Sequence, residues 1–276
     1  MLLRPNKTRT KLAAGDVAYG TITLIPEPSL AELLGAAGYD FIAIDMEHAA
    51  ADGRTIENMI RAAEAVEITP LVRVRHVEEK TFLWVLDSGA QGIVIPMLED
   101  AAMAREAYRL TRYPPDGDRT LCIVSRAAGR GAHRRNFTSF IEHVNREIML
   151  VGLIETPEAC ANAAAMAKEG IDAFLIGRAD LSMKMGYHYA PGHPNVIDAT
   201  KRALGSVMDA GKAAAVLAYD VEDAIRWMEF GCRMIIYSEP EHLLAAHFSE
   251  ALRAMKARDR ASPRFIADAV IGAAAE

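Results

Sequence analysis

The chain has few of the features that mark secreted or membrane proteins. Its three cysteines, Cys122, Cys160 and Cys232, lie far apart and show neither a metal-binding nor a CxxC spacing. An odd number of isolated thiols favours a reducing compartment over a disulfide framework. The N-terminal stretch MLLRPNKTRTKL contains no apolar run suited to a signal peptide, and no window approaches a membrane span. We therefore expect a soluble, cytoplasmic protein.

Excess positive charge is also absent. The formal net charge is −6, which gives no indication of a nucleic-acid partner. One short basic run contains Arg126, Arg130, Arg134 and Arg135. A run of this kind is usually a solvated loop, with an anion or subunit contact as the alternative.

What is present is a large apolar fraction in a regular order. Of 276 residues, 51% are hydrophobic, enough for one large α/β domain or two small ones. Eight short, almost continuous apolar runs predict strands buried on both faces, as in a parallel sheet. They are Tyr19–Leu24, Phe41–Ile44, Leu71–Val74, Gly92–Ile95, Met149–Ile154, Ala173–Ile176, Ala213–Leu217 and Arg233–Tyr237.

Amphipathic helical segments alternate with these strands. They are Ser29–Ala37, Thr55–Ala65, Glu78–Ser88, Ala101–Thr111, Pro157–Ala167, Pro194–Asp209, Val221–Phe230 and Glu241–Ala257. The alternation and the length predict a (β/α)8 TIM barrel. The alternative, an open doubly wound sheet, would want a glycine-rich phosphate loop after the first strand, where this chain has TLIPEPS.

The barrel is expected to be a single domain over residues 1–276, with a C-terminal helical extension over 241–276. The segment Tyr113–Arg146 is longer than a normal connection and begins with the turn-rich RYPPDGDRT. Long connections on barrels tend to be functional or to contact other subunits.

Ionisable residues follow several of the predicted strands. Asp45, Glu47 and His48 follow the second strand, and Arg73 lies at the end of the third. Glu155 follows the fifth. Arg178 and Asp180 follow the sixth. In a barrel of this kind the catalytic groups come from the carboxyl ends of the strands, so these side chains would share one mouth.

Glu155 and Asp180 would stand on neighbouring strands. Two carboxylates held close repel each other, and a divalent cation between them relieves the repulsion. Mg²⁺ and Mn²⁺ take one or two carboxylates together with waters and substrate oxygens. The alternatives are that Glu155 is an acidic residue before a helix and that Asp180 is a helix N-cap.

Arg73 and His48 have two interpretations each. Arg73 offers a planar fork to a substrate carboxylate, or it pairs with Asp45 or Glu47. His48 follows two acidic residues and is a candidate proton carrier, although an isolated histidine is more often structural.

Six segments together make the chain similar to the HpcH/HpaI aldolase family. They are YDFIAIDMEHAAAD, TPLVRV, LDSGAQGIVIPMLEDAAMAREA, RYPPDGDR, LIET and IGRADLSMKMGY, and their order and spacing agree from about Leu12 to Ala257. The resemblance implies a barrel of the phosphoenolpyruvate/pyruvate-domain type. It also implies a Mg²⁺-, Mn²⁺- or Co²⁺-dependent lyase that reversibly cleaves a 4-hydroxy-2-oxo acid to pyruvate, or a related 2-oxo acid, and an aldehyde through a metal-bound enolate.

The resemblance also assigns roles to residues. It implies Glu155 and Asp180 as metal ligands and Arg73 as the residue that binds the keto acid and supports its enolate. His48 would join the proton transfers. The remaining implied residues are Asp45 and Asp87 in the network that supports His48, and Gly177, Arg178, Ala179 and Leu217 around the substrate. The family commonly forms hexamers, trimers of dimers in which the last helix is exchanged between barrels.

The chain departs from the family pattern at three places. Leu153 stands where a glutamine is usual, Arg178 stands where a proline is usual, and GTITL lacks the usual aromatic residue. Arg178 either binds a second anionic group of the substrate or points away and pairs with a surface acid. Two further functions stay open: a citrate-lyase-β-like enzyme acting on a β-hydroxyacyl-CoA thioester, and a non-catalytic barrel that binds a small acid.

Overall fold

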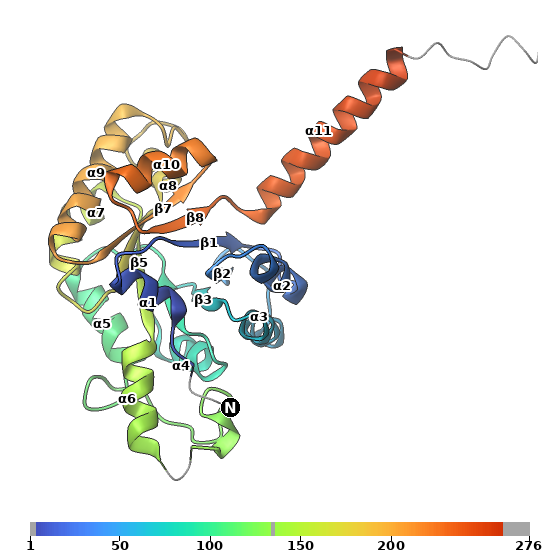
Figure 1. The fold of residues 1–276 in the computed structure, drawn as a ribbon. Helices are drawn as coiled ribbons and strands as arrows, with labels where there is room; N and C mark the ends of the chain where they lie inside the picture. The colour runs from blue at the N-terminus through green and yellow to red at the C-terminus, as the bar shows by residue number, and fades with distance from the viewer. Residues whose placement is uncertain (1–3, 134–135, 262–276) are drawn as a thin grey trace, which may run out of the picture. The chain divides into compact units, whose positions relative to one another are not determined.

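Eight parallel strands close into a barrel in the computed structural model, which describes residues 4–133 and 136–261. Each strand pairs with the next along the chain, and β8 pairs with β1 (Figure 1). The strands are β1 (Ala18–Thr23), β2 (Phe41–Asp45), β3 (Thr69–Arg73), β4 (Gly92–Ile95), β5 (Met149–Ile154), β6 (Ala173–Ile176), β7 (Ala213–Ala218) and β8 (Met234–Tyr237). The predicted TIM barrel is confirmed, and the closure excludes the open sheet.

The predicted helices are present with small changes at their ends. They are α2 (Pro28–Ala36), α3 (Gly53–Ala65), α4 (Glu79–Asp87), α5 (Ala101–Thr111), α7 (Pro157–Met166), α9 (Pro194–Asp209), α10 (Val221–Phe230) and α11 (Pro240–Ala261). Side chains of Asp52, Asp100, Thr156 and Asp220 cap α3, α5, α7 and α10 by accepting backbone N–H groups of the first turn.

In the described ranges, three α-helices were not predicted. They are α1 (Lys7–Ala13), α6 (Phe137–Glu147) and α8 (Arg178–Lys184). The long connection expected over Tyr113–Arg146 is present between α5 and β5, and α6 lies in its second half. Of the predicted basic run, Arg134 and Arg135 lie outside the described residues, and Arg126 is buried rather than solvated, pairing with Glu64.

Two apolar layers hold the barrel together. Inward-facing side chains such as Ile22, Leu71 and Leu153 fill the barrel interior. The opposite face of each strand packs on the helices, as Ile42 and Ile93 do. This two-sided burial explains why the strands read as continuous apolar runs.

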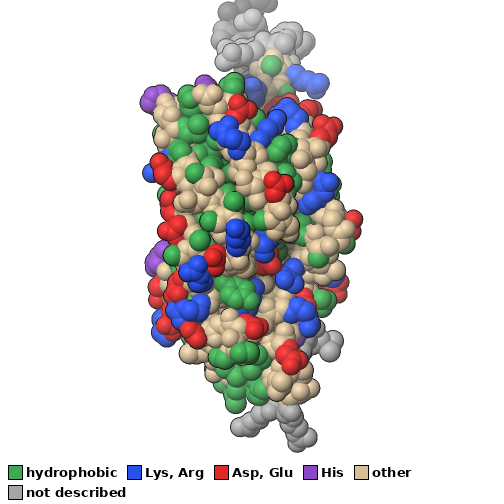
Figure 2. All heavy atoms as spheres, turned by 90° about the vertical axis from the view of Figure 1, so that its left-hand side faces the viewer, with side chains coloured by type: hydrophobic (Ala, Val, Ile, Leu, Met, Phe, Trp, Pro, Cys, Tyr) green, Lys and Arg blue, Asp and Glu red, His purple; other side chains and the backbone are tan. Residues whose placement is uncertain are grey.

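The outer surface carries charges of both signs. Figure 2 shows acidic and basic side chains interspersed over one face of the molecule. On α5, Arg105 pairs with Glu169 at 2.9 Å and Arg109 pairs with Glu106 at 2.7 Å. Exposed pairs of this kind contribute little to stability, because water screens them.

The chain divides into two compact units, Met1–Glu239 and Pro240–Glu276. The first contains the barrel, and the second contains α11. Considered by itself, α11 exposes several large apolar side chains: Leu243, Leu244, Phe248, Leu252 and Met255. Among the described residues, no helix is both long and apolar enough to cross a membrane.

We expect a Gly20→Ala substitution to destabilise the barrel by about 1–3 kcal/mol, because the interior has no room for a methyl group. A Cβ atom at Gly20 would lie 2.3 Å from the ring of Phe41. The matched control is Gly205→Ala in α9, where a Cβ atom would meet nothing within 4 Å. Urea unfolding of both variants is the measurement, and equal free energies of unfolding would contradict the expectation.

Candidate active site

The carboxyl ends of four strands bring the predicted charged residues to one mouth of the barrel. Asp45 ends β2 and lies directly beside Arg73, which ends β3. Glu155 follows β5 directly, and Asp180 lies in the first turn of α8, which follows β6. Asp45 and Glu155 are 110 positions apart in the sequence. They can share a site because parallel strands end at a common edge of the barrel.

Asp45 and Arg73 form a two-pronged ion pair. Arg73 donates from Nε to Oδ1 of Asp45 at 2.8 Å and from Nη2 to Oδ2 at 2.9 Å. Burial alone would raise the pKa of Asp45, but the hydrogen bond and charge of Arg73 hold that pKa below its ordinary value. The pairing that the sequence offered as one interpretation of Arg73 is therefore present.

Glu47 and His48 continue from Asp45 in a tight turn. Both oxygens of Asp45 accept backbone N–H groups, from Glu47 at 2.9 Å and from His48 at 3.1 Å. Glu47 then lies between two basic groups, with Oε2 at 3.4 Å from Nε of Arg73 and 3.7 Å from Nε2 of His48. The His48 side chain is 61% exposed, so its imidazole is open to solvent.

Glu155 is a carboxylate in a buried place. Its residue is 7% exposed, and Oε2 accepts a hydrogen bond from the backbone N–H of Met97 at 3.0 Å. Met97 has a left-handed backbone (φ 46°), an uncommon conformation outside glycine that aims its N–H at this carboxylate. Burial, reinforced by the charges of Asp180 and Glu47, raises the pKa of Glu155 to about 7.

Gly177, the residue before α8, allows this helix to lie against Glu155. A Cβ atom at Gly177 would lie only 2.8 Å from Cγ of Glu155, so a larger residue would push the carboxylate away. Gly177 is also the N-cap of α8. Asp180 is therefore not the N-cap that the sequence allowed, and Glu155 precedes the N-cap of α7, which is Thr156.

The two carboxylates suit a divalent cation. Asp180 is exposed and is close enough to raise the pKa of Glu155 by charge repulsion. A cation between them would remove that repulsion and keep Glu155 ionised. Over residues 4–133 and 136–261, no group of three or more His, Cys, Asp or Glu side chains could hold a metal. Two carboxylates completed by waters and substrate oxygens match the preference of Mg²⁺ and Mn²⁺.

The floor beneath these charges is apolar. Leu153 points into the barrel, is 3% exposed, and packs in the interior cluster that also includes Ile22, Leu175 and Leu217. An amide at position 153 would lie on the same side of β5 as Glu155, since the two are separated by one residue. The leucine therefore replaces a polar group at the floor by an aliphatic one.

Arg178 points away from the mouth, and the acid that it meets is buried. Its guanidinium forms an ion pair with Asp223 in α10 and donates from Nη2 to the carbonyl oxygen of Leu217 at 2.9 Å. This matches the second of the two alternatives, with the correction that Asp223 is a buried residue rather than a surface one. Leu217 thus meets Arg178 through its backbone.

Asp87 lies at the other end of the barrel. It ends α4, which returns to the start of β4, and its Oδ1 accepts a hydrogen bond from Nη2 of Arg119 at 2.7 Å. Within the described residues, no hydrogen bond or ion pair joins Asp87 to His48 of the same chain. Its expected role in the network of His48 stays a prediction.

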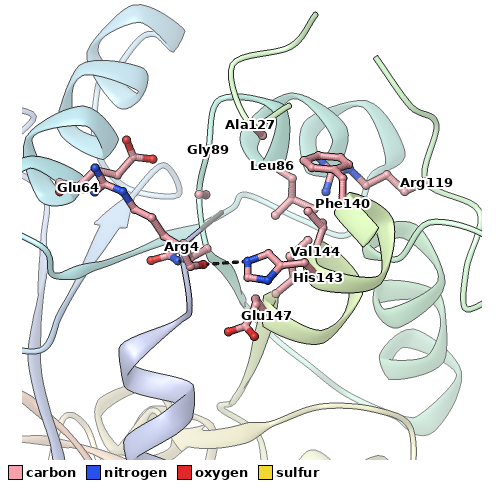
Figure 3. Close-up of a pocket in the computed structure, with 13 residues that line it drawn as sticks. Arg4, Glu64, Leu86, Gly89, Arg119, Ala127, Phe140, His143, Val144 and Glu147 are labelled. Atoms are coloured by element: carbon pink, nitrogen blue, oxygen red, sulfur yellow. Dashed lines mark hydrogen bonds between the residues drawn. The ribbon is translucent and has the colours of Figure 1, made fainter. Parts of the chain in front are cut away.

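A pocket of about 90 Å³ opens at this same amino-terminal end (Figure 3). Leu86, Phe140 and Arg119 line it, and His143 beside it makes a hydrogen bond with the carbonyl oxygen of Arg4 at 3.1 Å. Its lining includes Gln91 and Ile148, which immediately precede β4 and β5, so the pocket is separate from the mouth.

Known proteins resemble the chain over most of its length. Residues 24–235 match the family model described as HpcH/HpaI aldolase/citrate lyase. A hydroxypyruvate/pyruvate aldolase of Pseudomonas aeruginosa is 33% identical over 251 residues, which cover 91% of this chain and 92% of that protein. A 4-hydroxy-2-oxo-heptane-1,7-dioate aldolase of Escherichia coli is 34% identical, covering 90% and 94%. The crystal structure of citrate synthase SbnG matches with a TM-score of 0.83 at 31% identity, covering 91% and 98%.

We expect a Glu155→Gln substitution to stabilise the metal-free protein more at pH 8 than at pH 5. The pKa of Glu155 is about 7 in the folded protein, above its ordinary value of 4.5, so the unfolded chain loses this proton first. The wild type therefore loses stability as the pH rises from about 4.5 to 7, and the glutamine variant lacks this loss. Urea unfolding in chelator across this range tests it, and parallel pH profiles would contradict it.

Proposed function

We propose that this chain, which belongs to the HpcH/HpaI aldolase/citrate lyase family, is a divalent-metal-dependent aldolase. The relatives from Pseudomonas aeruginosa and Escherichia coli are named aldolases, so the chain is a carbon–carbon lyase. The proposed reaction reversibly cleaves a 4-hydroxy-2-oxo acid to pyruvate, or a related 2-oxo acid, and an aldehyde. The observation that carries this proposal is the placement of Glu155 and Asp180 beside the Asp45–Arg73 pair at one mouth.

Cleavage of the bond between C3 and C4 leaves a pyruvate enolate, whose oxygen carries negative charge. Glu155 and Asp180 would hold the cation, and a bound divalent ion supplies Lewis acidity that stabilises this charge. Arg73 adds a fixed positive charge beside them. Asp45 engages its Nε and Nη2, and in the described part of the chain its Nη1 makes no hydrogen bond, so this edge is available to the keto acid.

The proton transfers are assigned to His48. Removal of the proton from the 4-hydroxyl group requires a base near neutral pH, and an exposed imidazole meets this requirement. Glu47 at 3.7 Å from its Nε2 would stabilise the imidazolium that forms. Backbone around Gly177 and Ala179 is proposed to receive the carboxylate of the keto acid, next to Glu155.

A second candidate is supported by the name of one relative. The citrate synthase SbnG structure has the same fold, so this fold also carries an activity named for a larger acid. A citrate-lyase-like reaction on a β-hydroxyacyl thioester would use the same stabilisation of an enolate. The aldolase names of the relatives count against a non-catalytic acid-binding barrel.

The assembly proposed here is a hexamer built as a trimer of dimers. The barrel has an apolar groove of about 370 Å³ on its outer surface between α2 and α10, lined by Tyr19, Tyr39, Ile225, Met228 and Tyr237 among others. Apolar side chains of α11, including Phe248 and Leu252, are exposed. We propose that α11 of a neighbouring subunit covers such a groove, so that the barrel with its helical extension is one folding domain in the assembly.

We expect a Phe248→Asp substitution to break the oligomer, because it places a charge in the proposed helix contact. A matched control is Glu250→Asp on the same helix, which keeps the charge of an exposed residue. Sedimentation velocity of the full chain is the measurement. An unchanged hexamer in the Phe248→Asp variant, or a monomeric wild type, would contradict the exchange of α11.

We expect the wild type to exchange the methyl protons of pyruvate for solvent deuterium when Mn²⁺, Mg²⁺ or Co²⁺ is present, and to stop after chelation. Glu155→Gln and Asp180→Asn are expected to slow this exchange by about 100-fold or more, since each removes a charge that holds the cation. Glu158→Gln, an exposed glutamate in the first turn of α7, is the control. NMR of the methyl signal measures the exchange, and no exchange with any of these metals would contradict the enolate mechanism.

A further inference from the structure

The first turn of α8 carries Asp180 but is weakly held by the helix itself. The helix has 7 residues, and its N-cap, Gly177, makes no side-chain capping hydrogen bond. A helix this short gains little stability from its own hydrogen bonds. The position of Asp180 therefore depends on what the start of α8 contacts.

Arg178, the first residue of α8, contributes a charged side-chain contact to that turn, whose N-cap Gly177 also donates its backbone N–H to the carbonyl oxygen of Ile154 at 2.9 Å. Its Nη2 donates to the carbonyl oxygen of Leu217 at 2.9 Å, and its guanidinium pairs with both oxygens of Asp223. The same guanidinium lies 4.9 Å from the ring centre of Tyr219 and 5.1 Å from that of Trp227. Arg178 is 3% exposed, and its buried Nε makes no hydrogen bond within the described residues, so the pairing with Asp223 and Leu217 uses only its two terminal nitrogens.

Asp223 is itself held from several directions. It accepts hydrogen bonds from the backbone N–H of Tyr219 at 3.2 Å, from Nε1 of Trp227 at 3.1 Å and from Arg226 at 3.1 Å. Burial alone would raise the pKa of Asp223, but the hydrogen bond and charge of Arg178 lower it. The ion pair thus joins the start of α8 to the end of β7 and the start of α10.

Release of Arg178 toward a substrate is unfavourable in this geometry. It would leave Asp223 buried without its main counter-charge, and breaking one side of a buried pair is strongly destabilising. An arginine so committed acts through the position of its backbone rather than by binding an anion at the mouth.

We propose that Arg178 is a positioning residue for the metal site, which fixes the first turn of α8 so that Asp180 stays opposite Glu155. The inference deepens the proposed function and rests on it. Arg178 follows Gly177, whose missing side chain lets the turn lie against Glu155, and it precedes Asp180 by two residues. A shift of this one turn would therefore move one carboxylate relative to the other.

The test measures Mn²⁺ affinity by electron paramagnetic resonance of the free ion, together with the melting temperature of each metal-free variant. The Arg178→Lys variant has one ammonium group, which cannot bind both Leu217 and Asp223 as the planar guanidinium does. We expect this variant to bind Mn²⁺ about tenfold more weakly. Arg178→Gln with Asp223→Asn removes both buried charges, which protects folding, and is expected to weaken binding similarly. Arg226→Ala removes the exposed partner of Asp223 and is expected to bind Mn²⁺ as the wild type does.

The possible results distinguish the positioning role of Arg178 from the proposed metal function. Weaker Mn²⁺ binding in both Arg178 variants, with the Arg226 control unchanged, supports positioning. Variants that melt at lower temperature but bind Mn²⁺ as tightly as the wild type would show a structural role alone and overturn the inference, while the metal site would stand. If the folded wild type binds no Mn²⁺, and the Glu155→Gln substitution does not change the measured binding, the proposed metal function is overturned. The positioning role of Arg178 is then overturned with it.

Discussion

The buried carboxylate of Glu155 is the constraint around which the mouth of the barrel is arranged. Burial and the charge of the nearby Asp180 raise its pKa to about 7, although the hydrogen bond from the backbone N–H of Met97 acts in the lowering direction. A cation in that place would favour the ionised carboxylate. The left-handed backbone of Met97 directs its N–H at Glu155, and the absence of a side chain at Gly177 leaves room for the Glu155 side chain.

The Asp45–Arg73 pair complements this arrangement. Asp45 neutralises one edge of the guanidinium and at the same time shapes the turn that carries His48. Arg73 therefore stays charged and oriented close to Glu155, on whose pKa it acts in the lowering direction. Fixed positive charge and two carboxylates suited to a cation thus lie at one mouth, which is the arrangement that the proposed enolate chemistry would use.

The fold could be predicted from the sequence because its signals are local. Strands buried on both faces gave continuous apolar runs, and the alternation with helices then predicted the barrel. The charged strand ends could be predicted for the same reason, since closure places Asp45, Arg73 and Glu155 at one edge.

Other features depend on contacts between distant parts of the chain, and the sequence left them open or gave no sign of them. The direction of Arg178 is set by Asp223, 45 residues later, and nothing in the motif around Arg178 identifies that partner. The donor from Met97 is a backbone group, which sequence patterns do not report. The helix α8 is too short to give a periodic signal, and α6 follows the turn-rich start of the long connection between α5 and β5.

The central claim is that Glu155 and Asp180 share one divalent cation. Anomalous diffraction from crystals grown with Mn²⁺ and pyruvate measures this directly. The account predicts one strong peak at about 2.0–2.2 Å from a carboxylate oxygen of each residue, at the distance of direct coordination by a small divalent ion. A peak bonded to neither carboxylate, or no peak at saturating Mn²⁺, would contradict it.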